Sequence, residues 1–424
     1  MTDQVTTRAR VEQSMTRRRR AEVRFRLYGM LSIGFGLLCL VVLFGNIILK
    51  GGSAFEQTVL QSEVYLDGDY LELTPQSSVE ERRNADYEGL IKQYLKESIP
   101  VSGRNERRAL YSLVSVGAHW QLQKAVLDNP DLIGTALNIE LIMDDDVDQW
   151  FKHERDEGRA GRLSELQLGW LEQWASDGRL KSRFSTTFFT NGDSREPELA
   201  GVHGAMMGTF LTLMVTFLLS FPIGVAAAIY LEEFAPKNRV TEIVEININN
   251  LAAVPSITFG LLGLAIFINI FGVARSTPLI GGLVLTLMTL PTIIISGRAA
   301  IKSVPPSIRE AAFGLGASKM QVVFHHVLPL ALPGMLTGTI IGMAQALGET
   351  APLLMIGMIA FVVDVPGFIT DPSTVLPVQI FLWSDSPEQA FTERTSGAII
   401  VLLAFLIMMN TAAVWLRRRL ERRW

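Results

Sequence analysis

Apolar segments restrict most strongly what this chain can fold into. Six of them approach the roughly 20 residues that an α-helix needs to cross a bilayer. They cover residues 28–49, 203–230, 255–271, 279–296, 333–350 and 396–416. Residues 352–363 are also apolar, so they extend the fifth helix, kink it at Pro352 or lie in the outer leaflet. With 49% hydrophobic residues gathered into such blocks, the sequence predicts an all-α multi-pass membrane protein.

Positive charges beside these segments predict their orientation. Residues 1–27 contain eight arginines, and residues 417–424 contain five. The loops between segments two and three and between segments four and five hold six further Lys and Arg: Lys237, Arg239, Arg298, Lys302, Arg309 and Lys319. Because Lys and Arg accumulate on the cytoplasmic side, both basic tails and both loops are expected to be cytoplasmic.

The polar region between the first two segments, residues 50–200, is then expected outside. Residues 51–200 contain 27 Asp and Glu against 16 Lys and Arg, a balance of −11, whereas the rest of the chain is at +7. Helical periodicity and strand-like alternation predict a compact α+β domain. The helical pattern covers residues 87–99, 107–118 and 163–175, and the alternation covers residues 58–66 and 183–190. We hypothesise that this insert contacts a substrate-delivering soluble protein or a partner permease.

Several kinds of site are not indicated. The acidic run from Asp144 to Asp148 lacks the central Gly and terminal Glu of an EF-hand, which favours a solvated turn over a metal site. Cys39 is the only cysteine. Because neither a nucleotide-binding Gly-rich loop nor a catalytic motif occurs, we expect no cofactor, no catalysis and ATP hydrolysis by another chain. The lipid bilayer, and no nucleic acid, is expected as a partner.

A polar stretch between the fourth and fifth segments contains two predicted helix starts. Ser307 with Glu310, and Ser318 with Gln321, match the capping box, and Pro329 is expected to stop the second helix. Gly314 and Gly316 permit a sharp turn between the helices.

The first of these helices carries a narrow apolar face. Its members are Ile308, Ala311, Ala312 and Leu315, which recur at i, i+3, i+4 and i+7. Such a small-residue face fits a partner's groove, and the alternative is a surface hairpin without a partner.

An ionisable residue lies in the fifth segment. If that helix begins near Pro333, Glu349 lies about 24 Å along it, inside the ~30 Å hydrocarbon layer, and Gln345 lies one turn earlier on the same face. A carboxylate there indicates a cavity or a partner, and the alternative is a pair within the bundle. The fourth segment carries a hydroxyl stripe of Thr286, Thr289, Thr292 and Ser296. These hydroxyls line the same path or bond to their own helix.

Small residues predict where the helices pack. Gly334, Gly338, Gly342 and Ala346 recur every four residues, as do Gly204 and Gly208. This spacing lets membrane helices approach closely, and we interpret both stripes as packing surfaces within the bundle.

The polar stretch resembles a known loop. The residues Glu310-Ala311-Ala312-Phe313-Gly314-Leu315-Gly316, followed by Leu328-Pro329, are similar to the Glu-Ala-Ala loop of permease subunits of binding-protein-dependent ABC importers. His326 departs from the pattern, which has Ile there. The resemblance implies that Glu310, Ala311, Ala312, Leu315 and Gly316 couple this chain to an ATPase subunit.

Residues 200–424 carry a second, more specific resemblance. Gly348-Glu349-Thr350-Ala351-Pro352, with the runs 223–233 and 250–264, looks like the A-type permease of bacterial phosphate ABC importers. This implies a type I importer permease fold with six transmembrane helices, in which a core of residues 201–416 contains the coupling loop 297–332. It also implies a heterodimer with a second phosphate permease, two ATP-binding subunits and a periplasmic phosphate-binding protein at the bacterial inner membrane.

The resemblance also bears on the translocation path. The residues expected to line it are Gln345, Glu349, Thr350, Thr289 and Ser296. Gln345 stands where the family has Arg, so a positive charge is expected from the partner permease. The alternatives are a permease for another oxyanion or nutrient, such as molybdate or sulfate, and a membrane-anchored sensor.

Overall fold

The structure, a computed structural model, describes residues 2–155, 158–359 and 361–420, so Arg422 and Arg423 of the basic C-terminal tail lie outside the described residues. The chain divides into two units, residues 1–50 and 51–424. The first unit is one helix, α1 (Thr2–Gly51), of 50 residues. The predicted basic tail and first span are therefore one continuous helix. At about 1.5 Å per residue it measures about 75 Å, more than twice the thickness of the hydrocarbon layer.

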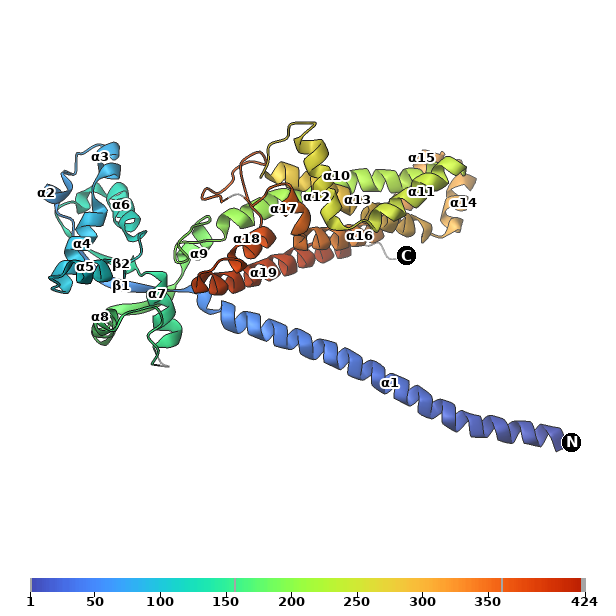
Figure 1. Ribbon diagram of the computed structural model, residues 1–424. Coiled ribbons are helices and arrows are strands. Elements are labelled where there is room, and N and C mark those ends of the chain that lie inside the picture. The colour runs from blue at the N-terminus through green and yellow to red at the C-terminus, as the bar shows by residue number, and fades with distance from the viewer. Residues whose placement is uncertain (1, 156–157, 360, 421–424) are drawn as a thin grey trace. The chain divides into compact units, whose positions relative to one another are not determined.

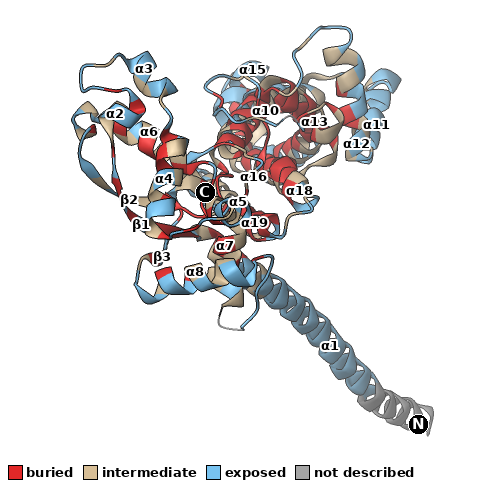
Figure 2. Cartoon of the chain, turned by 60° about the vertical axis from the view of Figure 1, so that its left-hand side comes forward, coloured by how far each residue is buried: buried red, intermediate tan, exposed pale blue. Residues whose placement is uncertain are grey.

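The insert is an α+β domain built on a small antiparallel sheet. Its strands are β1 (Glu56–Tyr65), β2 (Ala136–Ile142) and β3 (Leu180–Phe184), in the order β2-β1-β3. Val59 in the central strand lies opposite Ile142 on one side and Lys181 on the other. Its helices are α2 (Gly68–Leu71), α3 (Val79–Asn84), α4 (Tyr87–Ser98), α5 (Arg104–Tyr111), α6 (Ala118–Asp128), α7 (Asp145–Gln149), α8 (Glu165–Ser176) and α9 (Thr186–Thr190). The sheet and the helices α2 and α4 to α8 share one apolar core that includes Leu60, Leu113 and Trp174. Figure 2 shows buried segments in red within the insert.

Three of the five predicted elements of the insert are confirmed, because α4, α8 and β1 lie where the periodicity placed them. Residues 107–118 are not one helix, since α5 ends at Tyr111 and Val114 pairs with Met143 as a β-bridge. Residues 183–190 are not one strand either. The Ser185 side chain accepts a hydrogen bond from the Phe188 backbone N–H and starts α9, so a local N-cap overrides the alternation.

The remaining helices form the membrane bundle. They are α10 (His203–Ile229), α11 (Arg239–Ala252), α12 (Ser256–Gly263), α13 (Pro278–Lys302), α14 (Pro306–Gly314), α15 (Lys319–Gln321), α16 (Leu328–Gly348), α17 (Ala351–Met355), α18 (Leu376–Ser384) and α19 (Gln389–Leu420). In the described residues five helices are long and apolar enough to span a membrane. A sixth span results if α11 and α12, which meet at 104°, form one broken span.

Two predicted spans differ from the structure. The third is not a straight helix over residues 255–271. Pro255 separates α11 from α12, and α12 continues into a π-helical turn at Leu264–Ile268. The fifth begins well before Pro333, since the helix runs without a break over Lys319–Gly348. After Glu349 and Thr350 the chain forms the short helix α17, so residues 352–363 do not extend α16.

The small-residue stripes lie inside the bundle, as predicted. On α16, a Cβ added at Gly334 would lie 2.7 Å from the Ala300 Cβ of α13, and one added at Gly338 would lie 1.8 Å from the Ser296 Oγ. On α10, a Cβ added at Gly208 would lie 2.0 Å from the Thr374 carbonyl oxygen. Glycine at these positions therefore allows backbone to approach backbone.

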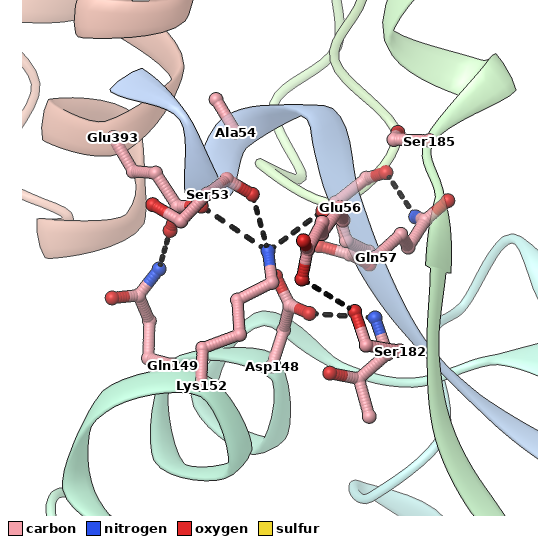
Figure 3. A network of polar contacts seen from close by, with 12 residues as sticks. Ser53, Ala54, Glu56, Gln57, Asp148, Gln149, Lys152, Ser182, Ser185 and Glu393 are labelled. Atoms are coloured by element: carbon pink, nitrogen blue, oxygen red, sulfur yellow. Dashed lines mark hydrogen bonds and ion pairs between the residues drawn. The ribbon is translucent and has the colours of Figure 1, made fainter. Parts of the chain in front are cut away.

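The insert joins the bundle through buried charges. The Lys152 Nζ lies 2.7 Å from Asp148 Oδ2 and 3.1 Å from Glu393 Oε1 of α19, and it donates to the carbonyl oxygens of Ser53 and Glu56 (Figure 3). All three charged side chains are at most 8% exposed. Lys152 thus binds together the insert, the segment after α1 and the N-terminal end of α19.

This network also shows that the predicted solvated turn at Asp144 to Asp148 is wrong. Asp148 is buried and accepts a hydrogen bond of 2.7 Å from the Thr58 backbone N–H of β1, so the run is not a solvated turn. Asp144 is the N-cap of α7, where it accepts from the Asp146 N–H. No group of metal-ligating side chains occurs in the described part of the chain.

We expect Lys152→Met to loosen the insert from the bundle. The change leaves Asp148 and Glu393 buried without their shared cation, which typically destabilises by roughly 3–5 kcal/mol. Faster protease cleavage of the purified protein near residues 53–56 and 191–200 would report it. Lys92→Met is the matched control, because the Lys92–Glu88 pair has the same i, i+4 spacing but is 42% and 64% exposed. It should change stability by no more than about 1 kcal/mol. Equal cleavage of both variants would contradict this assignment.

The stability of the insert should fall as the pH rises. Burial raises the pKa of Glu198 to about 8, that of Asp144 to about 7 and that of Asp145 to about 6, and neighbouring carboxylates add to each shift. A carboxyl group with a raised pKa holds its proton more tightly in the folded state. Its stabilising contribution is present below about pH 4 and is lost as the pH rises through about 6 to 8.

The test is thermal unfolding followed by tryptophan fluorescence between about pH 5 and about pH 8. The midpoint should decrease over this range, and Glu198→Gln should flatten the decrease. A midpoint that rises with pH would contradict the prediction.

Candidate functional site

The predicted functional residues lie in three parts of the bundle: Glu310 to Gly316 between α13 and α16, Gln345 to Thr350 at the end of α16, and Thr289 and Ser296 within α13. Residues 303–327, here called the elbow, connect α13 to α16. Figure 1 shows α14 and α15 at the end of the bundle remote from the insert. In a membrane, the end that holds α14 and α15 and the end that joins the insert would face opposite sides.

The elbow is a helical hairpin. The predicted cap at Ser318 is confirmed, and the predicted cap at Ser307 is wrong. Ser318 and Gln321 form the predicted capping box, in which the Gln321 side chain accepts from the Ser318 backbone N–H at 2.8 Å. Gly316, at φ +85°, makes the turn. Ser307 is not a cap, because the N-cap of α14 is Pro305, two residues earlier, and Pro306 begins the helix, where proline's fixed φ suits the first turn.

Pro329 does not stop the second helix, contrary to the prediction. It lies in the first turn of α16, directly after a π-helical turn at Val322–Val327 that joins α15 to α16. Shifted hydrogen bonds in such turns let membrane helices accommodate a proline. The elbow is therefore continuous with the fifth span and can move only together with it.

The face that α14 leaves free is different from the predicted one. Ala312 is 4% exposed and Ile308 half-buried, and both pack against Val322 and its neighbours in the bundle. Leu315 is 90% exposed, and Glu310 and Ala311 are also exposed. The exposed side chains form a surface, here called the elbow surface, which consists of Glu310, Ala311, Phe313, Leu315, Met320 and Phe324.

Ion pairs fix the elbow to the bundle. Arg309 pairs with Glu233 of the π-helical turn Tyr230–Phe234 at 2.8 Å, and it donates to the carbonyl oxygens of Ile301 and Val304 at the end of α13. Arg298 pairs in the same region with Glu245 at 2.7 Å and with Glu232 at 3.4 Å. Arg309 thus connects α14 to the ends of α10 and α13, and Arg298 connects α13 to α11.

Sequence reasoning missed these pairs. The sequence predicts Arg298 and Arg309 only as positive charges of cytoplasmic loops. The signal that could have revealed their role is the adjacent pair Glu232 and Glu233 directly after an apolar helix, where free carboxylates would be unexpected.

Glu349 and Gln345 lie at the opposite end of the fifth span. Gln345 is exposed, together with Ile341 and Gly348 on the same side of α16. Glu349 is the first residue beyond the helix and half-buried. Among the described residues, no Lys or Arg forms an ion pair with Glu349, so the charge has no partner there. Thr350 is half-buried and precedes α17.

The hydroxyl stripe does not join this surface. Thr289 is buried and donates to the Thr286 carbonyl, and Ser296 donates to the Thr292 carbonyl at 2.8 Å. Both face the glycine stripe of α16. Both hydroxyls thus bond to their own helix, as in one of the two alternatives given by the sequence.

The chain is similar in sequence to known transport proteins. Residues 220–424 match the family described as binding-protein-dependent transport system inner membrane component, and residues 12–160 match a domain of unknown function, DUF3333. The probable ABC transporter permease protein YqgI of Bacillus subtilis is 30% identical over 250 residues, which are 55% of this chain and 84% of the relative. The phosphate transport system permease protein PstA 1 of Mycobacterium tuberculosis is 30% identical over 217 residues, 51% of this chain and 70% of the relative.

A solved structure of the inward-facing MetNI methionine ABC transporter is 21% identical and covers 51% of this chain and 95% of its own, at a TM-score of 0.42. That superposition is too loose to add to the assignment.

The bundle with its elbow defines a membrane-spanning transport component. The chain belongs to the family of inner-membrane components of binding-protein-dependent transport systems. It is a permease subunit and not an enzyme. The DUF3333 match ends before β3, so the folded insert extends past that domain's boundary.

Proposed function

We propose that this chain is a permease subunit of an ATP-driven importer of inorganic phosphate. The observation that carries the proposal is the elbow, a helical hairpin with an exposed apolar surface, which Arg309 attaches to the ends of α10 and α13. Phosphate as the substrate is supported by relatives from Mycobacterium tuberculosis and Yersinia pestis, which are named phosphate transport system permeases. The block Gly348-Glu349-Thr350-Ala351-Pro352 agrees with them.

In this proposal the elbow surface docks onto an ATP-binding subunit. Glu310, Ala311, Leu315 and Gly316 make the contact, while Ala312 holds α14 to the bundle. When ATP closes the two ATPase subunits, the docked elbow moves as a lever. The pair Arg309–Glu233 and the continuous helix to Gly348 carry that movement to the far end of the fifth span.

The path for phosphate runs between this chain and a second permease. Gln345, Glu349 and Thr350 face it, and Thr289 and Ser296 keep α13 against α16 behind it. The second permease supplies the cation that Glu349 lacks among the described residues of this chain, because a charge within a membrane needs a partner. A phosphate-binding protein delivers the substrate from outside.

The proposal includes a topology. The elbow and both termini are cytoplasmic, and the insert, residues 50–200, is extracytoplasmic. The opposite placement of elbow and insert supports it (Figure 1). The protein is then a multi-pass component of the bacterial inner membrane.

The test is phosphate-dependent ATP turnover by the complete complex in lipid nanodiscs, with its second permease, ATPase subunits and binding protein. Phosphate-loaded binding protein should stimulate hydrolysis, and molybdate or sulfate should not replace phosphate. A complex that responds to one of those anions would overturn the substrate, and a chain that never purifies with an ATPase subunit would overturn the transport role.

Removing the charge of Glu349 should slow transport. We expect Glu349→Gln to reduce phosphate uptake about tenfold or more, because about 1.4 kcal/mol of lost interaction corresponds to a factor of ten. The level of folded chain should not change, since the carboxylate has no ion-pair partner among the described residues. Glu242→Gln removes an exposed carboxylate of α11 and is the control. Equal uptake by both variants would exclude Glu349 from the path.

A further inference from the structure

A groove lies where the insert meets the outer end of the bundle. It has a volume of about 520 Å³ and is here called the junction groove. Its walls come from three separate segments: α6 of the insert, the linker from α9 to α10, and the loop after α17. The residues used below are Trp120, Asp193, Arg195, Phe361 and Val363. In Figure 1 the loop after α17 extends from the bundle toward the insert.

The walls expose large apolar side chains. Trp120 is 55% exposed, Phe361 49% and Val363 59%. Arg195 lies over the Phe361 ring at 5.7 Å. The other face of α6, with Ala118, Leu122 and Val126, is fully buried in the core of the insert, so Trp120 is held on the surface. Clustered exposed apolar groups mark interaction sites, and Trp and Arg carry most of the energy in such interfaces.

Hydrogen bonds hold the walls in place. The Asp193 backbone N–H donates to the Val362 carbonyl at 3.2 Å, and the Trp383 Nε1 of α18 donates to the Asp193 side chain at 3.0 Å. A Cβ added at Gly192 would lie 1.9 Å from the Val363 carbonyl oxygen, so the linker and the loop are in direct contact.

The insert itself cannot swing away from the groove. Lys152 binds it to α19, and Arg394 of α19 donates to the Ala54 carbonyl at 3.0 Å. The Gln57 side chain of β1 donates to the Glu198 carbonyl of the linker at 2.7 Å. The groove is therefore preorganised, which lowers the entropy cost of binding a partner.

We propose that the junction groove is the docking site for one lobe of the solute-binding protein that delivers the anion, an inference that rests on the proposed function. The loop that forms one wall is connected through α17 to Thr350 and Glu349, which face the proposed path. The insert, which forms the other wall, is strongly acidic: residues 51–200 have a balance of −11. The matching lobe presents an apolar contact surrounded by Lys and Arg.

The experiment measures ATP hydrolysis by the nanodisc complex as the concentration of phosphate-loaded binding protein is raised. Trp120→Ala and Phe361→Ala should each raise the concentration for half-maximal stimulation about tenfold, because interface aromatics of this kind dominate affinity. The maximal rate and the rate without binding protein should not change. Tyr65→Ala, which removes a 57% exposed aromatic at the far end of β1, is the matched control and should have no effect.

A second measurement identifies the occupant. In a chain in which Cys39 is replaced by Ser, Trp120→Cys should crosslink to the binding protein in the presence of phosphate. Crosslinking to the second permease or to another copy of this chain would overturn the proposal. Quenching of a fluorophore at position 120 by spin-labelled lipid would overturn it in favour of a membrane contact.

These results are separable from the proposed function. If phosphate-loaded binding protein stimulates the complex but Trp120→Ala and Phe361→Ala leave the half-maximal concentration unchanged, the docking site is wrong and the phosphate importer stands. If no variant or parent complex responds to phosphate-loaded binding protein, the proposed function itself fails.

Discussion

Glu310→Lys is expected to abolish most phosphate-stimulated ATP hydrolysis in the assembled complex while leaving the chain folded. Glu310 is exposed on the elbow surface, and its side chain forms no ion pair among the described residues, so its reversal costs this chain little. In a docked complex the reversed charge would be desolvated beside the ATPase subunit, and juxtaposed like charges cost several kcal/mol. The measurements are co-purification with the ATPase subunit and ATP turnover with and without phosphate-loaded binding protein.

Two variants calibrate this result. Glu310→Gln removes the charge without reversing it and should have an intermediate effect. Glu80→Lys makes the same reversal at an exposed site of the insert and should behave as the parent. A bulky replacement of Gly316, such as Gly316→Leu, should uncouple in the same way, because φ +85° is strained for any residue with a Cβ. Normal phosphate-stimulated turnover in Glu310→Lys would refute the coupling role of the elbow.

Gly338→Leu is expected to prevent the bundle from folding. A Cβ at this position would lie 1.8 Å from the Ser296 Oγ and 2.2 Å from its Cβ, so α16 must move away from α13. Overpacking in a close-packed interior typically costs roughly 1–3 kcal/mol, and a clash with the neighbouring helix at this distance should exceed that range. The readout is the yield of monodisperse protein after extraction from membranes.

The same stripe contains its own control. A Cβ at Gly342 would lie 3.8 Å from the Thr289 Cβ, an ordinary contact, so Gly342→Ala should be tolerated. Gly338→Ala should fail alone and recover when combined with Ser296→Gly, which removes both clashing atoms. If Gly338→Ala and Gly342→Ala give equal yields, the close approach of α13 and α16 is not required.

The sequence predicted well those features that depend on neighbouring residues. Spans were recognisable because each needs an uninterrupted apolar stretch, and the capping box at Ser318 because its two partners lie three residues apart. The errors have local causes that compete with periodicity. Paired prolines moved the start of α14, Ser185 started a helix within an alternating pattern, and Pro255 broke the third span.

The sequence predicted where the helices of the elbow lie along the chain but not which side of each helix packs against the bundle. Ala312 and Leu315 were assigned to one outward face, yet α14 rests on the bundle with Ala312 and leaves Leu315 free. Similarly, the sequence leaves open whether Thr289 and Ser296 line the path with Gln345 or bond to their own helix, and in the structure they face the glycines of α16. A helical pattern defines which residues share a face, but the side on which a neighbouring helix packs is set by contacts distant in sequence.

The sequence alone therefore determined the class of this protein: apolar helices, a polar elbow between two of them, and a separate acidic insert. Only the tertiary structure decided how these parts are joined. Arg309 meets Glu233 across 76 residues, and Lys152 meets Glu393 across 241 residues. Charge patterns along a chain do not encode such pairs, because burial removes water from both partners only once the whole bundle has formed.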